Sequence, residues 1–469
     1  MNREKKIFLF APPVSLEKIY GGLAKTGAFS PPLNLLLLGG ILRNEGFVPT
    51  IIDSPSQGLT EEGIIKIIEN DSPHVVGITA MTPHIICAGN LANRIKERFS
   101  EILILLGGAH ISSEPMKTME RFPSIDVGFV GEADKSLVEF LSELKKGQPL
   151  PKIKGTIIRE DKKVLFCGER QDTINLDSLP FPAWDLLKDF PQGYPPPLFS
   201  AQRFPSVPII TSRGCPGKCI FCFSGCHKTI ATHSAEYIFE MLLDLRKKFK
   251  IREFMVYDDN FVMFSSNLKR LLKKIIEGNM DLTWVCNARV DMVNQELLEL
   301  MAKSGCRQIS YGIESGNQEI LNRIGKNVSK EKVREAIWLT KKVGIRTVGY
   351  FMIGHFGESK NTIMETMEFA RSSGLDDFRL SYFTPMPGTK SYEIAQEFGR
   401  FEDDWNKMTL FSPVFFPKGL SERDLRLKYK IALRRFFFRP KIILGYFRMV
   451  GSPVLAIKGA LALGRYLIS

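Results

Sequence analysis

Strand-like and helix-like patterns alternate with regular spacing in the first 150 residues, and this alternation restricts the fold more than any other feature. Short apolar runs rich in β-branched residues occupy Lys6–Ala11, Val48–Asp53, His74–Thr79, Ile102–Leu106 and Val127–Val130. Helical patterns occupy Leu33–Asn44, Thr60–Glu69, Ile85–Phe99, Pro115–Arg121 and Lys135–Lys146. Nearly continuous apolar strands are typical of a parallel sheet that helices cover on both faces. The pattern therefore predicts an α/β domain over residues 1–150.

The residues that end these strands are the candidates for ligand binding. In a flavodoxin-like (Rossmann-type) sheet, ligands bind at the carboxyl ends of the strands, near the point where the strand order reverses. The small or turn-forming candidates there are Pro12, Asp53, Thr79, Gly107, Gly108, His110 and Gly131. The dinucleotide fingerprint G-x-G-x-x-G does not follow the first strand. Ordinary turns also use these residue types, so the pattern alone leaves a binding role open.

Residues 151–205 are expected to connect two domains. The sequence predicts a hairpin from Ile153–Ile158 and Val164–Gly168, followed by a proline-rich stretch in which regular elements are not expected.

The alternation of strands and helices resumes at Val207. Strands are predicted at Pro208–Ser212, Glu253–Tyr257, Leu282–Asn287, Gln308–Gly312, Thr347–Ile353 and Phe378–Phe383. Helices are predicted at Ala235–Phe249, Asn267–Glu277, Gln295–Ser304, Gln318–Arg323, Lys330–Val343 and Lys360–Ser373. Six such units predict a partial (β/α)6 TIM-like barrel over residues 206–395, with its functional groups on the loops that follow the strands.

Three of the eight cysteines lie directly after the first of these strands. Cys215, Cys219 and Cys222 have the spacing C-x3-C-x2-C, and Phe221 precedes the last of them. Three thiolates can hold three irons of a 4Fe-4S cluster and leave the fourth iron open. Zinc is a weaker alternative, because it needs a fourth ligand at matching spacing. Cys226, with His227 beside it, could supply such a ligand or close the cluster.

This motif is complete, including its aromatic residue, and it resembles the signature of the radical S-adenosylmethionine (SAM) enzymes. The resemblance implies that Cys215, Cys219 and Cys222 hold the cluster, that Phe221 lies at the cofactor site, and that the open iron binds SAM. Arg213 and Lys218 are expected to place positive charge beside the cluster and to raise its reduction potential modestly.

Further motifs of the same family follow the later strands. Gly312–Gly316 matches G-x-E-S-G, so the resemblance places Glu314 and Ser315 against SAM, and it places Arg289 near the SAM carboxylate. A surface ion pair of Arg289 with Asp291 is the alternative. Asp258, in Tyr257-Asp-Asp-Asn-Phe, is expected to line the site and is a candidate acid or base. His355 stands in a loop that departs from the family pattern and is a candidate for proton transfer.

The first 150 residues resemble the cobalamin-binding domain that precedes the barrel in one branch of these enzymes. The matching elements are Pro31-Pro-Leu-Asn-Leu-Leu-Leu-Leu, Ile51-Ile-Asp, Gly107-Gly-Ala-His and Val130-Gly-Glu. The motif D-x-H-x-x-G, which supplies an axial histidine to cobalt, is absent, because Ser54 and Pro55 follow Asp53. The cobalamin contacts named above, including His110, follow from this resemblance, and a polar contact is favoured for His110 over a bond to cobalt.

The net charge of +13 is concentrated near the end of the sequence, since residues 425–469 contain ten Lys or Arg and no Asp or Glu. This asymmetry argues against a general affinity for nucleic acid. A helical, basic region is predicted over 396–469, with membrane-surface contact as one interpretation and a cap on the barrel as the other. The expected location is the cytoplasm, because no signal peptide is recognised and the cysteines follow metal spacing rather than a disulfide framework.

The combined motifs predict an enzyme that uses a 4Fe-4S cluster, SAM and cobalamin to modify an unactivated carbon, most simply by C-methylation. Oxidative cyclisation of a tetrapyrrole or lipid-like substrate, as in the magnesium-protoporphyrin monomethyl ester cyclase branch, is the alternative. An iron–sulfur electron carrier or sensor is the alternative from another class. The expected partners are a small substrate, of hydrophobic character in one interpretation, and a reductant such as flavodoxin or ferredoxin.

Overall fold

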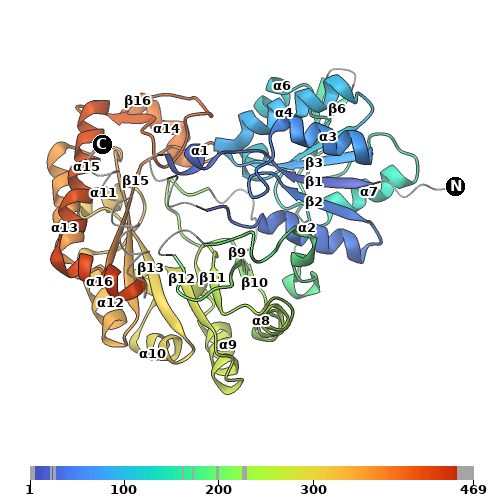
Figure 1. The fold of residues 1–469 in the computed structure, drawn as a ribbon. Helices are drawn as coiled ribbons and strands as arrows, with labels where there is room; N and C mark the ends of the chain where they lie inside the picture. Colours follow the sequence, from blue (N-terminus) through green and yellow to red (C-terminus); the bar gives the residue numbers. More distant parts are fainter. Residues whose placement is uncertain are drawn as a thin grey trace.

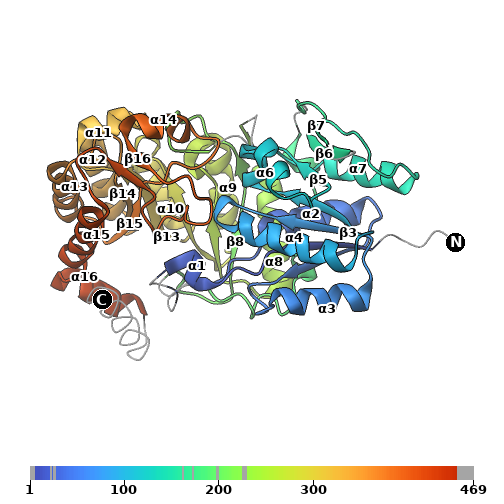
Figure 2. The ribbon, with the colours of Figure 1, turned by 90° about the horizontal axis from the view of Figure 1, so that it is seen from above.

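The computed structural model describes residues 6–21, 24, 28–160, 163–171, 174–196, 200–223 and 230–450, with the side chains of 447–450 left out. Two lobes lie side by side, an N-terminal α/β lobe and a barrel-like lobe (Figures 1 and 2). Cys226 and His227 lie outside the described residues, so their predicted roles as extra ligands are not addressed by the structure.

The N-terminal lobe is built on a seven-stranded sheet with the order β2-β1-β3-β4-β5-β6-β7. Its parallel strands are β1 (Ile7–Ala11), β2 (Pro49–Asp53), β3 (Val75–Thr79), β4 (Leu103–Gly107) and β5 (Val127–Phe129). Its helices are α1 (Leu16–Tyr20), α2 (Leu33–Asn44), α3 (Glu61–Asp71), α4 (Ile85–Arg98), α5 (Ala109–Ser113), α6 (Pro115–Arg121) and α7 (Ser136–Lys145). The flavodoxin-like order reverses direction between β1 and β3, which places the ligand position at their carboxyl ends. The α/β prediction is confirmed.

The predicted hairpin forms, but it extends the N-terminal sheet rather than standing apart in the connector. β6 (Thr156–Glu160) pairs antiparallel with β5, and β7 (Lys163–Phe166) pairs antiparallel with β6. Ile157 and Ile158 are fully buried and point to opposite faces, so β6 contributes to the core on both faces of the sheet.

The second lobe is a six-stranded parallel sheet, curved into an incomplete barrel, with the order β15-β14-β13-β12-β11-β8. Its strands are β8 (Ser206–Ile209), β11 (Glu253–Val256), β12 (Thr283–Ala288), β13 (Cys306–Glu314), β14 (Arg346–Ile353) and β15 (Asp377–Tyr382). Its helices are α8 (Ala235–Phe249), α9 (Ser265–Glu277), α10 (Gln295–Lys303), α11 (Gln318–Arg323), α12 (Lys330–Lys342) and α13 (Lys360–Ser372). A short ladder of β9 (Ser212–Arg213) with β10 (Ala231–Thr232) follows β8. This arrangement confirms the barrel prediction.

The helices of the barrel begin where the sequence supplies capping side chains. Ser234, Asn294 and Ser329 each accept a hydrogen bond from a backbone N–H in the first turn of α8, α10 and α12. Such caps satisfy N–H groups that have no partner within the helix and typically stabilise it by about 1 kcal/mol. The apolar faces of these helices then pack on the outside of the sheet.

The C-terminal region covers the far side of the barrel with its last two helices, while the segment around Trp405 packs on the N-terminal lobe. It comprises α14 (Lys390–Phe398), β16 (Gly399–Phe401), β17 (Phe415–Pro417), α15 (Glu422–Phe437) and α16 (Pro440–Val450). α15 packs against α13 and β15 at the outer edge (Figure 2). Within the described residues, no helix has the length and apolar character needed to cross a bilayer.

Candidate functional site

The loop that carries the three cysteines leaves the barrel after β8 and β9, and we call its described residues 214–223 the cysteine loop. A methyl group placed on Gly217 would lie 3.4 Å from Cys215 Sγ, 3.9 Å from Cys219 Sγ and 3.5 Å from Arg289 Nη1. Two thiols and one guanidinium therefore surround a residue that has no side chain of its own.

The third thiol, on Cys222, belongs to the same group. Desolvation, with smaller contributions from Asp259, Cys219 and Cys215, raises the pKa of Cys222 to about 11, although part of the residue is accessible to water. Thiols with raised pKa values still lose their protons when they bind a metal. The described residues hold no set of three or more His, Cys, Asp or Glu side chains suited to one metal ion. Thiolates of a cubane cluster each bind a different iron, so such a set is not required.

The base of the cysteine loop is held by Asp258, which follows β11. Its carboxylate accepts hydrogen bonds from Thr211 N, Thr211 Oγ1 and Ser212 Oγ, each 2.6 Å long. The carboxylate is buried, and it accepts these hydrogen bonds from the two residues that precede Arg213. Asp258 thus holds the segment that leads into the cysteine loop.

The far side of the cysteine loop packs on the turn that ends α11. Ile220 N donates a hydrogen bond to Ile324 O (3.1 Å), and Phe221 packs beside Ile320, Leu321 and Ile324. Gly325 has φ +70, and a methyl group there would lie 2.7 Å from Lys218 O. Only glycine allows this close approach of two backbones at a left-handed residue.

A buried ion pair lies next to the thiols. Lys326 Nζ is 3.0 Å from Glu314 Oε1, and the two side chains are 9% and 11% exposed. Glu314 has φ +71, an uncommon conformation for a residue with a side chain and one that clusters at functional sites. The structure brings Glu314 and Arg289 to the cysteine loop, since Arg289 Nη2 also donates to Lys326 O (3.2 Å).

Arg289 forms the ion pair with Asp291 that the sequence offered as the alternative, and its contact with SAM stays a prediction. Its Nε and Nη2 donate to Asp291 at 3.0 and 2.8 Å. Its Nη1 faces Gly217 between the thiols of Cys215 and Cys219. The ion pair with Asp291 therefore holds the guanidinium in place while one edge points toward the thiols.

Ser315 and His355 lie deeper than the thiols. Ser315 is fully buried, and its hydroxyl lies 3.0 Å from Thr366 Oγ1 of α13. His355 is also fully buried beside Phe383, close to the Glu314 carbonyl, and neither ring nitrogen reaches hydrogen-bond geometry with another described residue. Burial lowers the pKa of His355 to about 4, so the ring is neutral at physiological pH.

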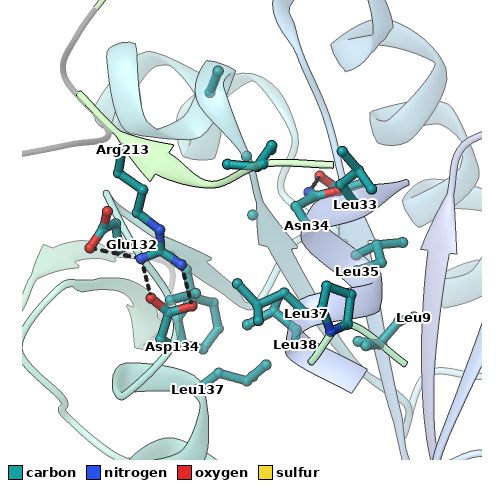
Figure 3. A pocket seen from close by; sticks show the side chains of 18 of the residues that line it. Leu9, Leu33, Asn34, Leu35, Leu37, Leu38, Glu132, Asp134, Leu137 and Arg213 are labelled. Atoms are coloured by element: carbon teal, nitrogen blue, oxygen red, sulfur yellow. Dashed lines mark hydrogen bonds and ion pairs between the residues drawn. The ribbon is translucent and has the colours of Figure 1, made fainter. Parts of the chain in front are cut away.

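A cavity of about 520 Å³ lies between the carboxyl ends of the N-terminal strands and the start of the barrel. We call it the inter-domain cavity, and Figure 3 shows it from close by. Of the predicted cobalamin contacts, Thr79, Gly107, Gly108 and Gly131 line it. Its volume is within the range of about 300–1,000 Å³ that is usual for small-molecule sites.

Pro12, Asp53 and His110 do not line this cavity. Asp53 is buried beside Ser56 and Tyr194, which contact its carboxylate. His110 is buried with its Nδ1 3.1 Å from Thr82 Oγ1 and its ring 4.4 Å from that of Trp405. His110 therefore makes a polar contact within its own lobe, and its role in cobalamin binding stays a prediction.

Arg213 points into the inter-domain cavity (Figure 3). Its Nη1 lies 2.5 Å from Asp134 Oδ2 and 3.1 Å from Glu132 Oε2, both on the loop after β5. Two carboxylates of the other lobe thus lie against this guanidinium, and the effect of Arg213 on the cluster potential stays a prediction.

The cavity also contains residues that the sequence did not single out. Asn34 on α2 donates to Thr79 Oγ1 (2.6 Å) at one end. His233 and Tyr237 stack with ring centroids 3.9 Å apart at the barrel side. Asn34 lies within Pro31–Leu38, a stretch that resembles the cobalamin-binding domain. This resemblance could have identified Asn34 as a residue of the cavity. No sequence pattern pointed to His233 or Tyr237.

Comparison with known proteins agrees with this geometry. Residues 209–370 match the Radical SAM superfamily, and residues 21–141 match the B12 binding domain. The chain is 31% identical over 444 residues to an uncharacterized methyltransferase of Pyrococcus horikoshii, with 94% of each chain covered. This chain is a cobalamin-binding radical SAM enzyme.

Two further comparisons place it within this group. The anaerobic magnesium-protoporphyrin IX monomethyl ester cyclase of Rubrivivax gelatinosus is 25% identical, over 89% of this chain and 76% of the cyclase. The radical SAM methyltransferase TsrM of Kitasatospora setae, solved with cobalamin and a 4Fe-4S cluster, has the same fold, with a TM-score of 0.71 and 16% identity. The alignment covers 93% of this chain and 90% of TsrM.

The cofactors of a cobalamin-binding radical SAM enzyme are a 4Fe-4S cluster, SAM and cobalamin, and the residues present fit them. The thiols around Gly217 match a three-cysteine cluster site. Gly107 faces open space at the cavity, because a methyl group there would meet nothing within 4 Å. The space beside β3 and β4 is thus free for a cofactor at the position where flavodoxin-like sheets bind ligands.

Proposed function

We propose that this radical SAM enzyme methylates an unactivated carbon of a small molecule. The observation that carries the proposal is continuity between the two sites. Ile209, Ile210, Ser212 and Arg213 line the inter-domain cavity, and the first cluster cysteine follows at position 215. One short segment of chain thus joins the cobalamin side to the cluster side. The Pyrococcus horikoshii relative, which bears the name of a methyltransferase, supports the same reaction class.

We assign the following roles to the site residues. Cys215, Cys219 and Cys222 bind the cluster, and Arg289 and Glu314 bind the carboxylate and amino groups of SAM by charge-assisted hydrogen bonds. When bound, the cluster supplies the electron that cleaves SAM to the 5′-deoxyadenosyl radical, and cobalamin supplies the methyl group. The protein positions these reactants and excludes water and oxygen.

In this proposal, three of the predicted residues do not contact the substrate or a cofactor but position other residues. Asp258 positions the cysteine loop through Thr211 and Ser212. Ser315 fixes β13 to α13, and we assign His355 a packing role next to Glu314, without a hydrogen bond to another described residue. Burial disfavours proton transfer by His355, because its neutral ring does not reach the solvent.

Anaerobic reconstitution with iron, sulfide, hydroxocobalamin, SAM and a reductant tests the reaction class. We expect 5′-deoxyadenosine and, only when cobalamin is present, S-adenosylhomocysteine, because methylation takes its methyl group from SAM. A Cys219→Ala variant should lose 5′-deoxyadenosine, whereas Cys167→Ala, on the hairpin side of the N-terminal lobe, should retain it. If the wild-type protein made no 5′-deoxyadenosine, the radical assignment would fail.

Oxidative cyclisation is the second candidate, and the similarity to the Rubrivivax gelatinosus cyclase favours it. Cyclisation releases no S-adenosylhomocysteine, so the same experiment distinguishes the two reactions. Production of 5′-deoxyadenosine by the wild-type protein would also separate either enzyme from an electron carrier or sensor.

We propose that a small reductant protein such as flavodoxin or ferredoxin supplies the electron, since each reductive cleavage consumes one.

We also propose that the basic C-terminal helices contact membrane surfaces. Phe438 and Leu444, which are 57% and 50% exposed, lie among arginines and lysines there, a composition suited to anionic headgroups. Vesicle co-sedimentation of the full chain that was independent of anionic lipid would contradict this role.

A further inference from the structure

Three residues form one row across the last three strands of the barrel. The register pairs Gly312 of β13 with Tyr350 of β14, and Tyr350 with Arg379 of β15. Paired residues of parallel strands point to the same face of a sheet. A methyl group on Gly312 would lie 2.6 Å from Glu314 Oε1, so this face is the inner face that carries the proposed SAM-binding pair.

The packing of β15 independently places Arg379 on the inner face. Phe378 stacks on Phe436 of α15, with centroids 5.0 Å apart, and Tyr382 stacks on Tyr429 at 4.8 Å. Side chains alternate between the two faces of a strand. Since the neighbours of Arg379 pack outward on α15, Arg379 points inward.

The two polar side chains of the row are accessible to solvent. The Arg379 side chain is 45% exposed and Tyr350 is 41% exposed. The contact described for the Arg379 guanidinium is the ion pair of its Nη2 with Asp377, and within the described part of the chain no hydrogen bond is found at the Tyr350 hydroxyl. The Glu314–Lys326 pair takes the space beside Gly312, so among the described residues the Tyr350 hydroxyl and the remaining guanidinium N–H groups of Arg379 are the donors that this row offers.

The charges at this end of the barrel do not balance. Asp377 is buried, and its Oδ2 lies 3.2 Å from Arg346 Nη2 and 3.5 Å from Arg379 Nη2. One carboxylate thus stands between two guanidinium groups, which leaves one positive charge in excess. Two other buried ion pairs of the barrel, Glu314 with Lys326 and Glu253 with Arg307, are each balanced. An excess charge among protein atoms is stabilised when an anion binds.

We infer that Arg379 and Tyr350 bind an oxyanion of the substrate, a carboxylate or a phosphoryl group. The planar guanidinium matches the two oxygens of such a group, and the tyrosine hydroxyl supplies a further donor. The row lies two residues before Glu314 on β13, so the anion anchors the substrate directly below the SAM-binding layer. The inference rests on the proposed function and names the class of molecule that reaction would take.

Binding of small probe anions tests this site. The holoenzyme, with cluster and cobalamin, is saturated under anaerobic conditions with S-adenosylhomocysteine, so that the SAM position is occupied. Benzoate, phenylphosphonate and the neutral isostere benzamide are then titrated, with dissociation constants from ligand-observed NMR. We expect at least one anion to bind about tenfold more tightly than benzamide. Benzoate and phenylphosphonate distinguish a carboxylate site from a phosphoryl site.

Two variants and a matched control assign the preference to these residues. Arg379→Gln should abolish it, and Tyr350→Phe, which removes only a hydroxyl, should weaken anion binding by roughly fivefold without changing benzamide binding. Arg426→Gln removes an exposed arginine that pairs with Glu422 on α15 and should leave the preference intact. If Arg379→Gln does not fold, Tyr350→Phe decides the question.

The inference is overturned if the wild-type enzyme binds benzamide as tightly as both anions, or if the preference survives unchanged in both variants. Neither result would contradict the proposed function, provided that the protein still produces 5′-deoxyadenosine. Conversely, the protein could make no 5′-deoxyadenosine and still bind anions with a preference that depends on Arg379. This result would support the anion site and reject the proposed reaction.

Discussion

At the scale of single residues, the site depends on charges that are buried in pairs. Glu314 and Lys326 are nearly inaccessible to water and lie 3.0 Å apart, next to the cysteine thiols. Removal of one partner from such a pair leaves an unpaired buried charge, whereas removal of both is often tolerated. Single and double variants of this pair can therefore distinguish an effect on stability from an effect on cofactor binding.

We predict that Glu314→Gln destabilises the protein by about 3–5 kcal/mol, because Lys326 then has no counter-charge. The double variant Glu314→Gln/Lys326→Met should regain most of that stability but not SAM cleavage. Urea unfolding and 5′-deoxyadenosine production measure the two effects. If the double variant cleaved SAM at the wild-type rate, Glu314 would not bind the cofactor.

Glu358 is a second buried carboxyl. Its Oε2 accepts hydrogen bonds from the Gly354 and His355 N–H groups. Burial raises its pKa to about 8, against 4.5 in the ordinary carboxyl. The folded protein therefore keeps a proton that the unfolded chain releases between these values. Glu358 thus contributes stability at low pH that is lost as the pH rises toward 8.

We predict that Glu358→Gln flattens this loss, because the amide oxygen can accept the same hydrogen bonds without ionising. The stability of the wild-type protein relative to the variant should fall between pH 6.5 and 8 by at most about 1.4 kcal/mol per pH unit. Burial also lowers the pKa values of His84, His110, His233 and His355 to about 4, but both proteins contain these residues, so their contribution cancels in the comparison. Parallel curves for the two proteins would contradict the prediction.

At the scale of elements, the turn after α11 supports the cysteine loop. The backbone of Gly325 approaches Lys218 too closely for a side chain, and Ile220 N donates to the same turn. The position of the cluster ligands thus depends on a helix end that lies about a hundred residues later in the chain. Gly344, after α12, offers a comparison, since it has φ +84 with nothing within 4 Å of an added methyl group.

We predict that Gly325→Ala lowers the iron content after reconstitution by more than half, because the added methyl group displaces the cysteine loop. Gly344→Ala should lose only the roughly 1–2 kcal/mol of a strained left-handed residue and keep its iron. Iron per chain, with a urea unfolding curve for each variant, measures both effects. Equal iron content in the two variants would show that the contact with Lys218 is not required.

At the scale of the whole molecule, the two lobes meet through an ion-pair group at the cobalamin side. Arg213 of the barrel lies among Glu132 and Asp134 of the N-terminal lobe, and its side chain is 12% exposed. This contact borders the inter-domain cavity (Figure 3). We therefore expect the cobalamin site to depend, through this contact, on how the two lobes are positioned relative to each other.

We predict that Arg213→Met reduces cobalamin retained after desalting at least fivefold, because two carboxylates are left uncompensated beside the cavity. Arg94→Met is the matched control, since Arg94 also pairs with two carboxylates but lies exposed on α4. It should cost less than about 1 kcal/mol and leave cobalamin retention unchanged. The corrinoid absorbance per chain distinguishes the two outcomes.

Local patterns were sufficient for much of this protein. Period and composition decide which segments become strands and helices, so α2, α6, α8 and α11 have the predicted bounds, and Cys215, Cys219 and Cys222 lie within one loop. Contacts between distant segments were decided only by the tertiary structure. Sequence spacing does not show that Arg213 faces Asp134, that Asp53 lies away from the cavity, or that Tyr350 and Arg379 share a row. Those relations depend on strand register and on how the two lobes pack, because residues far apart in the chain meet only when the sheets form.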